Sequence, residues 1–283
     1  MTTGTPGGPF GARLRAAMDA RGPLCAGIDP HAGLLTGWGL PDSVDGLERF
    51  ALGAAEALGP AVAAIKPQSA FFERFGSRGV AVLERTIKVC REAGALVILD
   101  VKRGDIGSTA QAYADAYLDP SSPIAVDAIT ASPFLGFGSL APMLDTARKH
   151  DAGVFVLALT SNPEGPQVQH AITDTGRSVA AAMLDGLRDA NAGAGALGSF
   201  GAVVGATIGE AGAGLDLDIH GPLLVPGIGA QGGTADDVRR IFAGVLDLVL
   251  PSSSREILGA GPDPAALRAA AEEAADAFAA LVR

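Results

Sequence analysis

The segment from Asp100 to Asp105 brings three charged side chains together at a spacing suited to chemistry. Asp100 and Lys102 are two residues apart in an apolar run, so on a strand their side chains point to the same face. Burying a charge is costly unless it is paired, so a lysine between two aspartates indicates a mutually neutralising array, to which Lys66 would add a second cation. A fixed ammonium can stabilise negative charge that develops in a reaction. A structural ion network is the alternative interpretation.

A second candidate site is the glycine run Gly227–Gly233, whose backbone N–H groups could bind an anion. Arg255 follows the next apolar run and would add a guanidinium. Tight turns also need glycine, so the run alone is not specific. Its position together with Arg255 is typical of a phosphate site.

The remaining polar candidates are less specific. Asp105 and Thr109 are four residues apart at a predicted helix start and share a helical face, although capping of that helix by Asp105 is the alternative. His31, His150, His170 and His220 are scattered, and no pair has the spacing of metal ligands, so we predict no metal site. His31, close after Asp29, remains a candidate for a role at the site.

Eight short apolar runs recur along the chain. Most are continuous rather than alternating, as expected for strands buried on both faces of a parallel sheet. The predicted strands are Leu24–Asp29, Ala61–Lys66, Ala95–Lys102, Ala125–Ala131, Val154–Thr160, Phe200–Ala206, Leu223–Gly227 and Leu246–Leu250.

Helix-length segments separate these runs. The predicted helices are Val44–Gly59, Phe71–Ala93, Ser108–Leu118, Gly138–His150, Gln167–Asn191, Thr234–Gly244 and Pro264–Arg283, with a weaker candidate at Ile208–Asp218. This alternation without a linker predicts one α/β domain over residues 1–283, a (β/α)8 TIM barrel. An N-terminal extension and helix would occupy about residues 1–20, and the C-terminal helix residues 264–283. An open doubly wound sheet is the alternative, but the first predicted strand lacks its usual glycine fingerprint.

In such a barrel the C-terminal ends of the strands meet at one mouth, where active sites form. The residues that the predicted strands deliver there are Asp29, Lys66, Asp100, Lys102, Thr160-Ser161-Asn162, Gly227–Gly233 and Arg255. The two candidate sites are therefore expected to lie at one mouth.

The composition narrows the classes of partner. The chain has 21 Lys and Arg against 31 Asp and Glu, and its net charge of −10 argues against nucleic acid or an anionic membrane as the partner. It shows no signal-peptide pattern and no apolar run near the ~20 residues that span a bilayer. Cys25 and Cys90 lie in apolar runs and are expected to be buried free thiols. We expect a cytoplasmic protein with a small-molecule ligand.

Several motifs together resemble the orotidine 5′-phosphate decarboxylase family, in particular its longer bacterial branch. The matching segments are Gly27–His31, Ile65–Gln68, Asp100-x-Lys102-x-x-Asp105 within Leu99–Thr109, and Pro226–Gly233. The resemblance extends from Leu24 to about Leu258. It implies a homodimeric barrel that uses no cofactor. It also implies conversion of orotidine 5′-monophosphate to uridine 5′-monophosphate (UMP) and CO2, the last step of de novo pyrimidine synthesis.

The resemblance also implies roles for the charged residues. Asp100 would lie beside the substrate carboxylate. Lys102 would stabilise the C6 carbanion and then protonate it. Asp29 and Lys66 would bind the ribose hydroxyls, and Lys66 would also orient the charged array.

The remaining implied roles concern binding and the dimer. Asp105 and Thr109 would reach the ribose in the neighbouring subunit's site. Ser161 would hydrogen-bond the pyrimidine. The groups that would hold the phosphate are Gln231, the amides of Gly232 and Gly233, and Arg255.

Two other functions remain open at this point. Sugar-phosphate decarboxylases or aldolases of the same superfamily share the Asp-x-Lys-x-x-Asp core and use Mg²⁺ to hold an enediolate. A catalytically silent barrel that binds nucleotides is the second. Lys66 and the Ser161-Asn162-Pro163 segment favour the decarboxylase over the sugar enzymes.

Overall fold

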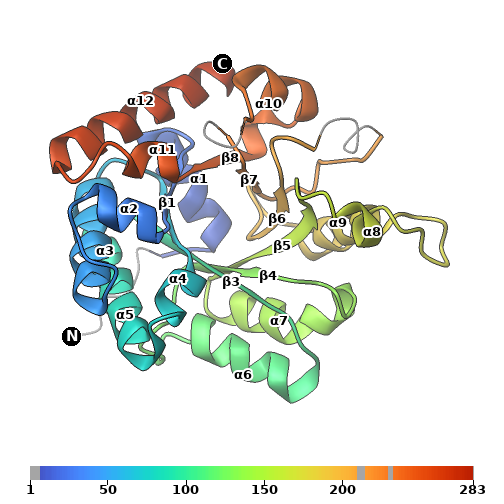
Figure 1. The fold of residues 1–283 in the computed structure, drawn as a ribbon. Coiled ribbons are helices and arrows are strands. Elements are labelled where there is room, and N and C mark those ends of the chain that lie inside the picture. Colours follow the sequence, from blue (N-terminus) through green and yellow to red (C-terminus); the bar gives the residue numbers. More distant parts are fainter. Residues whose placement is uncertain (1–6, 209–213, 229–231, 283) are drawn as a thin grey trace.

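A computed structural model describes residues 7–208, 214–228 and 232–282 of the chain. Eight parallel strands close into a barrel in sequence order, and β8 pairs back onto β1 (Figure 1). The strands are β1 Cys25–Ile28, β2 Ala64–Pro67, β3 Leu96–Arg103, β4 Ala128–Ala131, β5 Gly153–Leu159, β6 Phe200–Val204, β7 Leu223–Pro226 and β8 Val249–Ser253. The closed order confirms the predicted (β/α)8 barrel and contradicts the open sheet.

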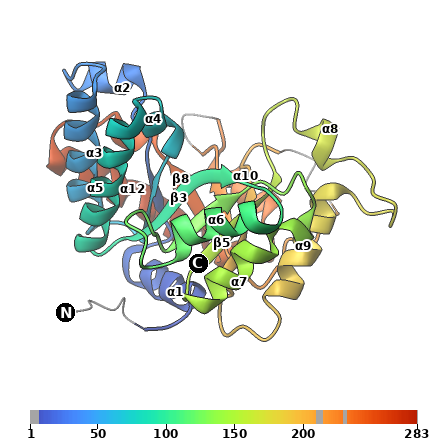
Figure 2. The same cartoon turned by 90° about the horizontal axis from the view of Figure 1, so that it is seen from below.

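Helices surround the barrel, as the two perpendicular views show (Figures 1 and 2). The α-helices are α1 Phe10–Arg21, α2 Ala32–Gly37, α3 Val44–Leu58, α4 Ser69–Glu73, α5 Gly76–Glu92, α6 Gly107–Leu118, α7 Ala141–Lys149, α8 Pro166–Gln169, α9 Val179–Ala190, α10 Ala235–Ile241, α11 Arg255–Leu258 and α12 Pro264–Val282. Two 3-10 turns, η1 Phe137–Leu140 and η3 Leu246–Leu248, precede α7 and β8. None of the helices within the described residues has the length and apolar character needed to cross a membrane.

Helix α1 packs across the N-terminal ends of the strands. The ring of Phe10 lies edge-on to that of Phe155 in β5, with centroids 5.9 Å apart. Arg13 donates to Asp127, directly before β4, at 2.5 Å, and Asp127 also accepts from the backbone N–H of Val97 in β3 at 2.9 Å. These contacts cover the N-terminal end of the barrel, and the C-terminal end is left for a site.

The last strand lies three residues later than predicted. Leu246–Leu248 forms the 3-10 turn η3, and the strand runs from Val249 to Ser253. The pairing with both neighbours sets this register, because Val249 lies opposite Leu223 of β7 and Ser252 lies opposite Cys25 of β1. Two serines thereby enter the barrel wall, and both are buried.

Two predicted helices are each divided in the structure. The helix predicted over residues 71–93 is broken at Arg74–Phe75, and Gly76, the first residue of α5, has a positive φ of 65°. The helix predicted over residues 167–191 is interrupted after α8. There Ile172 pairs with Ser178 in an antiparallel bridge, and the Ser178 side chain caps α9 by accepting from the N–H of Ala181.

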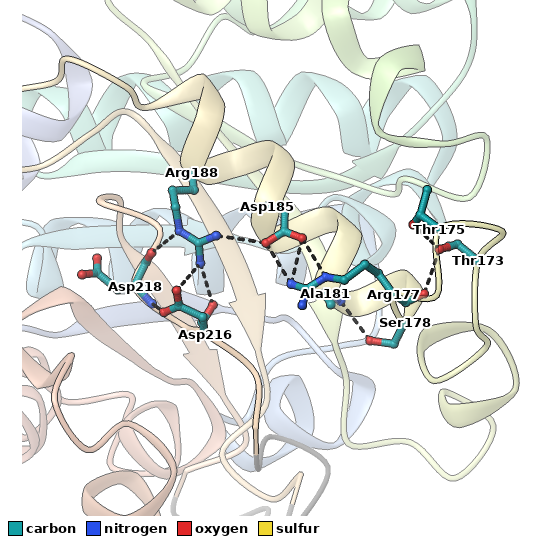
Figure 3. A network of polar contacts seen from close by, with 9 residues as sticks. All are labelled: Thr173, Thr175, Arg177, Ser178, Ala181, Asp185, Arg188, Asp216 and Asp218. Carbon is teal, nitrogen blue, oxygen red and sulfur yellow. Dashed lines mark hydrogen bonds and ion pairs between the residues drawn. The ribbon is translucent and has the colours of Figure 1, made fainter.

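Over its described residues, the weak helix predicted at Ile208–Asp218 is wrong. Residues 209–213 lie outside the described part of the chain, and residues 214–218 are not helical. Asp216 instead joins a polar network on α9 (Figure 3), in which Asp185 accepts from both Arg177 and Arg188, and Arg188 also contacts the Asp216 carboxylate at 2.9 Å. This side-chain network connects the segment before β7 to α9 without helical hydrogen bonds of its own.

Candidate active site

A cavity of about 340 Å³ opens at the C-terminal end of the barrel. Every strand contributes to its wall, either directly or through the residue that follows it. One lining residue from each, in strand order, is Asp29, Lys66, Asp100, Thr130, Thr160, Val203, Leu224 and Ser252. Polar side chains come from the β1–β4 side and also from β8 and the residues after it, whereas β6 and β7 provide apolar ones. The cavity is therefore suited to a ligand with one charged and one less polar part.

Asp100 is the centre of a compact charged cluster. Its side chain is only 8% exposed and accepts from Lys66 Nζ at 2.9 Å and from Lys102 Nζ at 2.5 Å. The hydroxyl of Thr130 donates to the same carboxylate at 2.8 Å. The Lys102 side chain is 43% exposed, so its ammonium can meet a ligand in the cavity while it stays paired with Asp100.

The surroundings of Asp100 and Lys66 favour the charged forms of both groups. Burial by itself would raise the pKa of Asp100, but the ammonium groups of Lys66 and Lys102 hold that pKa well below its usual range. Burial would likewise lower the pKa of Lys66, but the nearby carboxylates of Asp100 and Asp29 raise it above its usual value. The site is thus a preorganised set of fixed charges around neutral pH.

Lys102 has an unusual backbone conformation for a lysine at a strand end. Its φ is 44°, in the left-handed region, and the pairing of β3 with β4 shifts register between Leu99 and Arg103. The N–H of Lys102 donates to Thr130 Oγ1 at 2.9 Å. The same threonine therefore holds both the Lys102 backbone and the Asp100 carboxylate. A strained residue at the centre of a charged cavity is typical of a functional site.

Asp29 presents an unused acceptor to the cavity. It follows β1 and lines the wall, and its Oδ1 atom is buried without a hydrogen-bond partner among the described residues. A buried carboxylate oxygen without a partner is costly unless a ligand supplies a donor. A hydroxyl-bearing ligand would satisfy it. Nearby, the ring of His31 packs against that of Phe71, with centroids 4.1 Å apart, and both line the cavity.

Across the cavity from β3 and β4 lie the segments after β7 and β8. Arg255, the first residue of α11, lines the cavity and is exposed. Gly232 is exposed with a φ of 91°, and Gly233 is buried. The N–H of Gly233 donates to the carbonyl of Gly227 at 2.9 Å, so this amide is engaged within the loop. Gln231 lies outside the described residues.

Comparison with known proteins identifies the family of this barrel. Residues 22–270 match the family described as orotidine 5′-phosphate decarboxylase / HUMPS. The chain belongs to this family. The orotidine 5′-phosphate decarboxylase of Nocardioides sp. is 68% identical over 88% of this chain and 92% of its own length, and that of Salinispora arenicola is 64% identical over 96% and 98%. A crystal structure from Streptomyces avermitilis superposes with a TM-score of 0.96 at 59% identity and covers 100% of this chain and 99% of its own.

The residues predicted from the decarboxylase family divide into two groups. The cavity brings together Asp29, Lys66, Asp100, Lys102 and Arg255. Within the described part of the chain, the residues predicted for the site that do not line this cavity are Asp105, Thr109, Ser161, Gly232 and Gly233. Asp105 Oδ1 accepts from the N–H of Ile106 at 2.8 Å, and Thr109 is exposed on α6. Ser161 is exposed, and its neighbour Thr160 is the residue that lines the cavity.

The structure adds two polar residues to which the resemblance assigned no role. Thr130 is almost fully buried in the apolar strand β4 and bonds Asp100. With its amide nitrogen turned toward Asp100, Gln68 donates to Oδ2 at 2.8 Å and to the Asp100 carbonyl at 2.9 Å. Both had a signal in the sequence, because Thr130 is a polar residue within an apolar run and Gln68 follows Lys66 by two residues. Over the described residues, no group of three or more metal-ligating side chains is placed to hold a metal ion.

Proposed function

We propose that this chain decarboxylates orotidine 5′-monophosphate to UMP and CO2, the last step of de novo pyrimidine nucleotide synthesis. The observation that carries the proposal is the Lys66–Asp100–Lys102 cluster at the mouth of a barrel of this family. The reaction leaves an electron pair on a pyrimidine carbon without an electron sink in the ring. A fixed ammonium beside that carbon meets this need directly.

Lys102 has the central chemical role in the proposed reaction. The bond between C6 and the carboxylate carbon breaks, CO2 leaves, and the electron pair stays on C6. The ammonium of Lys102 stabilises the developing carbanion and then gives it a proton, which forms the C6–H bond of UMP. Lys102 regains its proton from water. The Asp100 carboxylate holds the lysine ammonium in place, and its own position would be beside the substrate carboxylate.

The rest of the cavity would bind the nucleotide. Asp29, with its free buried oxygen, and Lys66 would take the ribose hydroxyls. Arg255 and the Gly232 amide would hold the phosphate. The phosphate is distant from the reacting carbon, but its binding energy would hold the whole substrate in the site. Gln231 and Gly233 belong to the same proposed phosphate loop. Ser161 would hydrogen-bond the pyrimidine from the end of β5.

The proposed enzyme is a homodimer with sites shared between subunits. Asp105 and Thr109 do not line the cavity of their own barrel. Large apolar side chains are exposed nearby, one next to Asp105 in the sequence and two on the loop after β4. Ile106 is 62% exposed, and Phe134 and Leu135 after β4 are 78% and 53% exposed. These side chains would be covered by a second copy, which would bring Asp105 and Thr109 to the neighbouring ribose.

The proposed compartment is the cytoplasm, and the proposed ligand is a small nucleotide rather than nucleic acid or a membrane. The two cysteines support a reducing compartment, because Cys25 and Cys90 are both free and buried. The net charge of −10 also disfavours binding to nucleic acid or an anionic lipid surface.

An absorbance assay on EDTA-treated protein tests this function. We expect loss of the orotidine 5′-monophosphate ultraviolet band without added metal. Turnover of pentulose or hexulose phosphates alone, with a need for Mg²⁺, would instead indicate a sugar-phosphate enzyme. Tight UMP binding without any turnover would indicate a nucleotide sensor.

A further inference from the structure

Gln169, the last residue of α8, binds Thr160 through both ends of its side-chain amide. Its Oε1 accepts from the backbone N–H of Thr160 at 2.9 Å, and its Nε2 donates to Thr160 Oγ1 at 2.6 Å. Thr160 follows β5 and lines the cavity. One planar amide thus fixes both the backbone and the side chain of a residue at the cavity wall.

The contact continues beyond Thr160 in one consistent direction. The Thr160 hydroxyl accepts from Gln169 and donates its only proton to Asn162 Oδ1 at 2.6 Å. Asn162 Nδ2 then donates to Glu164 Oε2 at 3.0 Å, so the chain of hydrogen bonds ends on a carboxylate. Each member uses its donor and acceptor without conflict, which favours a single geometry. Ser161 lies between the two residues that this chain restrains.

The other side of this turn is packed against the end of β6. A side-chain carbon placed on Gly205 would lie 3.3 Å from the backbone nitrogen of Ser161, and the N–H of Gly205 donates to the carbonyl of Leu159 at 2.9 Å. The turn is therefore held between Gly205 and α8. Displacement of α8 would release it on one side only.

The segment that follows α8 is bound to α9. The chain after it returns to α9, where the N–H of Val179 donates to the carbonyl of Ala171 at 2.9 Å. Arg177 forms two hydrogen bonds of 3.0 Å with Asp185 on α9, as Figure 3 shows. The four-residue helix α8 is thus supported by a longer element, and Gln169 transmits that support to Thr160.

We propose that Gln169 is a positioning residue that sets the affinity of the site for the pyrimidine base, by holding Thr160–Asn162 in place at the cavity wall. This inference rests on the proposed function, in which Ser161 meets the base. It assigns no contact between Gln169 and the substrate. The loss of Gln169 should therefore weaken binding of ligands that carry a base and spare ligands that carry only the sugar phosphate.

The test compares Gln169→Leu with Gln167→Leu, an exposed glutamine two residues earlier on the same short helix. Binding of UMP and of D-ribose 5-phosphate is measured by calorimetry for both variants and for the wild type. We expect Gln169→Leu to bind UMP about tenfold more weakly, from the loss of two hydrogen bonds, and ribose 5-phosphate with unchanged affinity. Gln167→Leu should match the wild type for both ligands. In turnover, Gln169→Leu should raise KM more than it lowers kcat.

Gln169→Glu provides a second variant that keeps an acceptor for the Thr160 N–H, loses the donor to Thr160 Oγ1 and adds a negative charge. Its affinity for UMP should lie between those of Gln169→Leu and the wild type. If the leucine variant fails to fold, this variant is used for the comparison instead. If Gln169→Leu loses affinity equally for UMP and ribose 5-phosphate, or keeps its UMP affinity unchanged, the inference is overturned. In both cases turnover by the wild type leaves the proposed function intact. A wild-type chain that neither binds UMP nor decarboxylates its precursor would overturn the proposed function first.

Discussion

The ammonium of Lys102 lies 2.5 Å from Asp100 Oδ1, although the Lys102 backbone is in the left-handed region. The sequence spacing of two predicts that these side chains share a face, and the contact confirms it. The left-handed φ of 44° and the register shift show that β3 is no longer regular at this point. Thr130 compensates by accepting from the Lys102 N–H and donating to Asp100. The lysine is thus placed by its contacts rather than by strand geometry alone.

Replacement of Lys102 should separate chemistry from binding. We expect Lys102→Ala to abolish turnover and still bind UMP, because the proposed phosphate-binding groups lie on the other side of the cavity. Asp100 keeps its contacts with Lys66 and Thr130, so the variant should fold. Lys88→Ala, an exposed lysine on α5, is the control and should retain full activity. Turnover above about one hundredth of wild type would contradict a role in both carbanion stabilisation and protonation, since such roles contribute ~10²–10⁴-fold.

The lowered pKa of Asp100 predicts a specific pH dependence of stability. Below the ordinary carboxyl pKa the unfolded chain takes up a proton that the folded chain does not, so the Asp100 contribution is present above about pH 4 and is lost as the pH falls. Asp100→Asn lacks this titration. The difference in unfolding free energy between wild type and variant should therefore narrow by about 1 kcal/mol between pH 4 and pH 3.

Urea unfolding followed by circular dichroism at several pH values measures that difference. Between about pH 5 and pH 6 the two stability curves should run parallel. Curves that remain parallel down to pH 3 would mean that Asp100 titrates alike in the folded and unfolded chain, which would contradict its charged pairing with the two lysines.

The sequence predicts this fold well because a parallel barrel buries its strands on both faces. The continuous apolar runs therefore mark β1 to β7 directly. The sequence does not locate β8, because Leu246–Leu250 is apolar except for Asp247 and could form a turn or a strand. Only pairing with β1 and β7 decides between the two. The break after α8 did have a signal in the sequence, because Thr173-Asp174-Thr175-Gly176 is typical of a turn. The Ile172–Ser178 bridge and the Arg177–Asp185 contact that shape this segment are tertiary and leave no such signal.

The candidate site was predictable to the extent that charge is costly to bury. Lys66, Asp100 and Lys102 must find partners, and they do so with each other. Hydrogen bonds within loops, in contrast, cannot be predicted from the residue types in the sequence. The Gly233 amide looks available in the sequence, yet it donates to Gly227, because Gly233 pairs with Ile228. The Gln169 amide likewise finds Thr160 only after the chain has turned through α8.

Arg255 should act on the phosphate alone. We expect Arg255→Ala to raise KM strongly for orotidine 5′-monophosphate and to leave turnover of the phosphate-free nucleoside almost unchanged, because a guanidinium gains nothing from a substrate without phosphate. Arg78→Ala, an exposed arginine on α5, serves as the control with unchanged kinetics on both substrates. Equal losses on the two substrates would assign Arg255 a structural role at the start of α11.

A mixture of two inactive variants tests whether the sites are shared between subunits. If the chain forms the proposed homodimer, the Lys102→Ala and Asp105→Ala dimers should each be nearly inactive. A mixed dimer has one site with both substitutions and one with neither, if Asp105 serves the neighbouring subunit. Random pairing makes about half the dimers mixed, each with one intact site of two, so activity should recover to roughly a quarter of wild type.

The alternative is that Asp105 serves only its own subunit. There its Oδ1 accepts from the N–H of Ile106, just before α6. If Asp105 only stabilises this local turn, every Asp105→Ala subunit is damaged on its own account. Every Lys102→Ala subunit then lacks its lysine as well, and no combination of the two contains an intact site. Subunit exchange, followed by mass spectrometry on differently tagged copies, must therefore accompany the activity measurement. Exchange without recovery would show that each subunit uses its own Asp105 and would contradict the shared site.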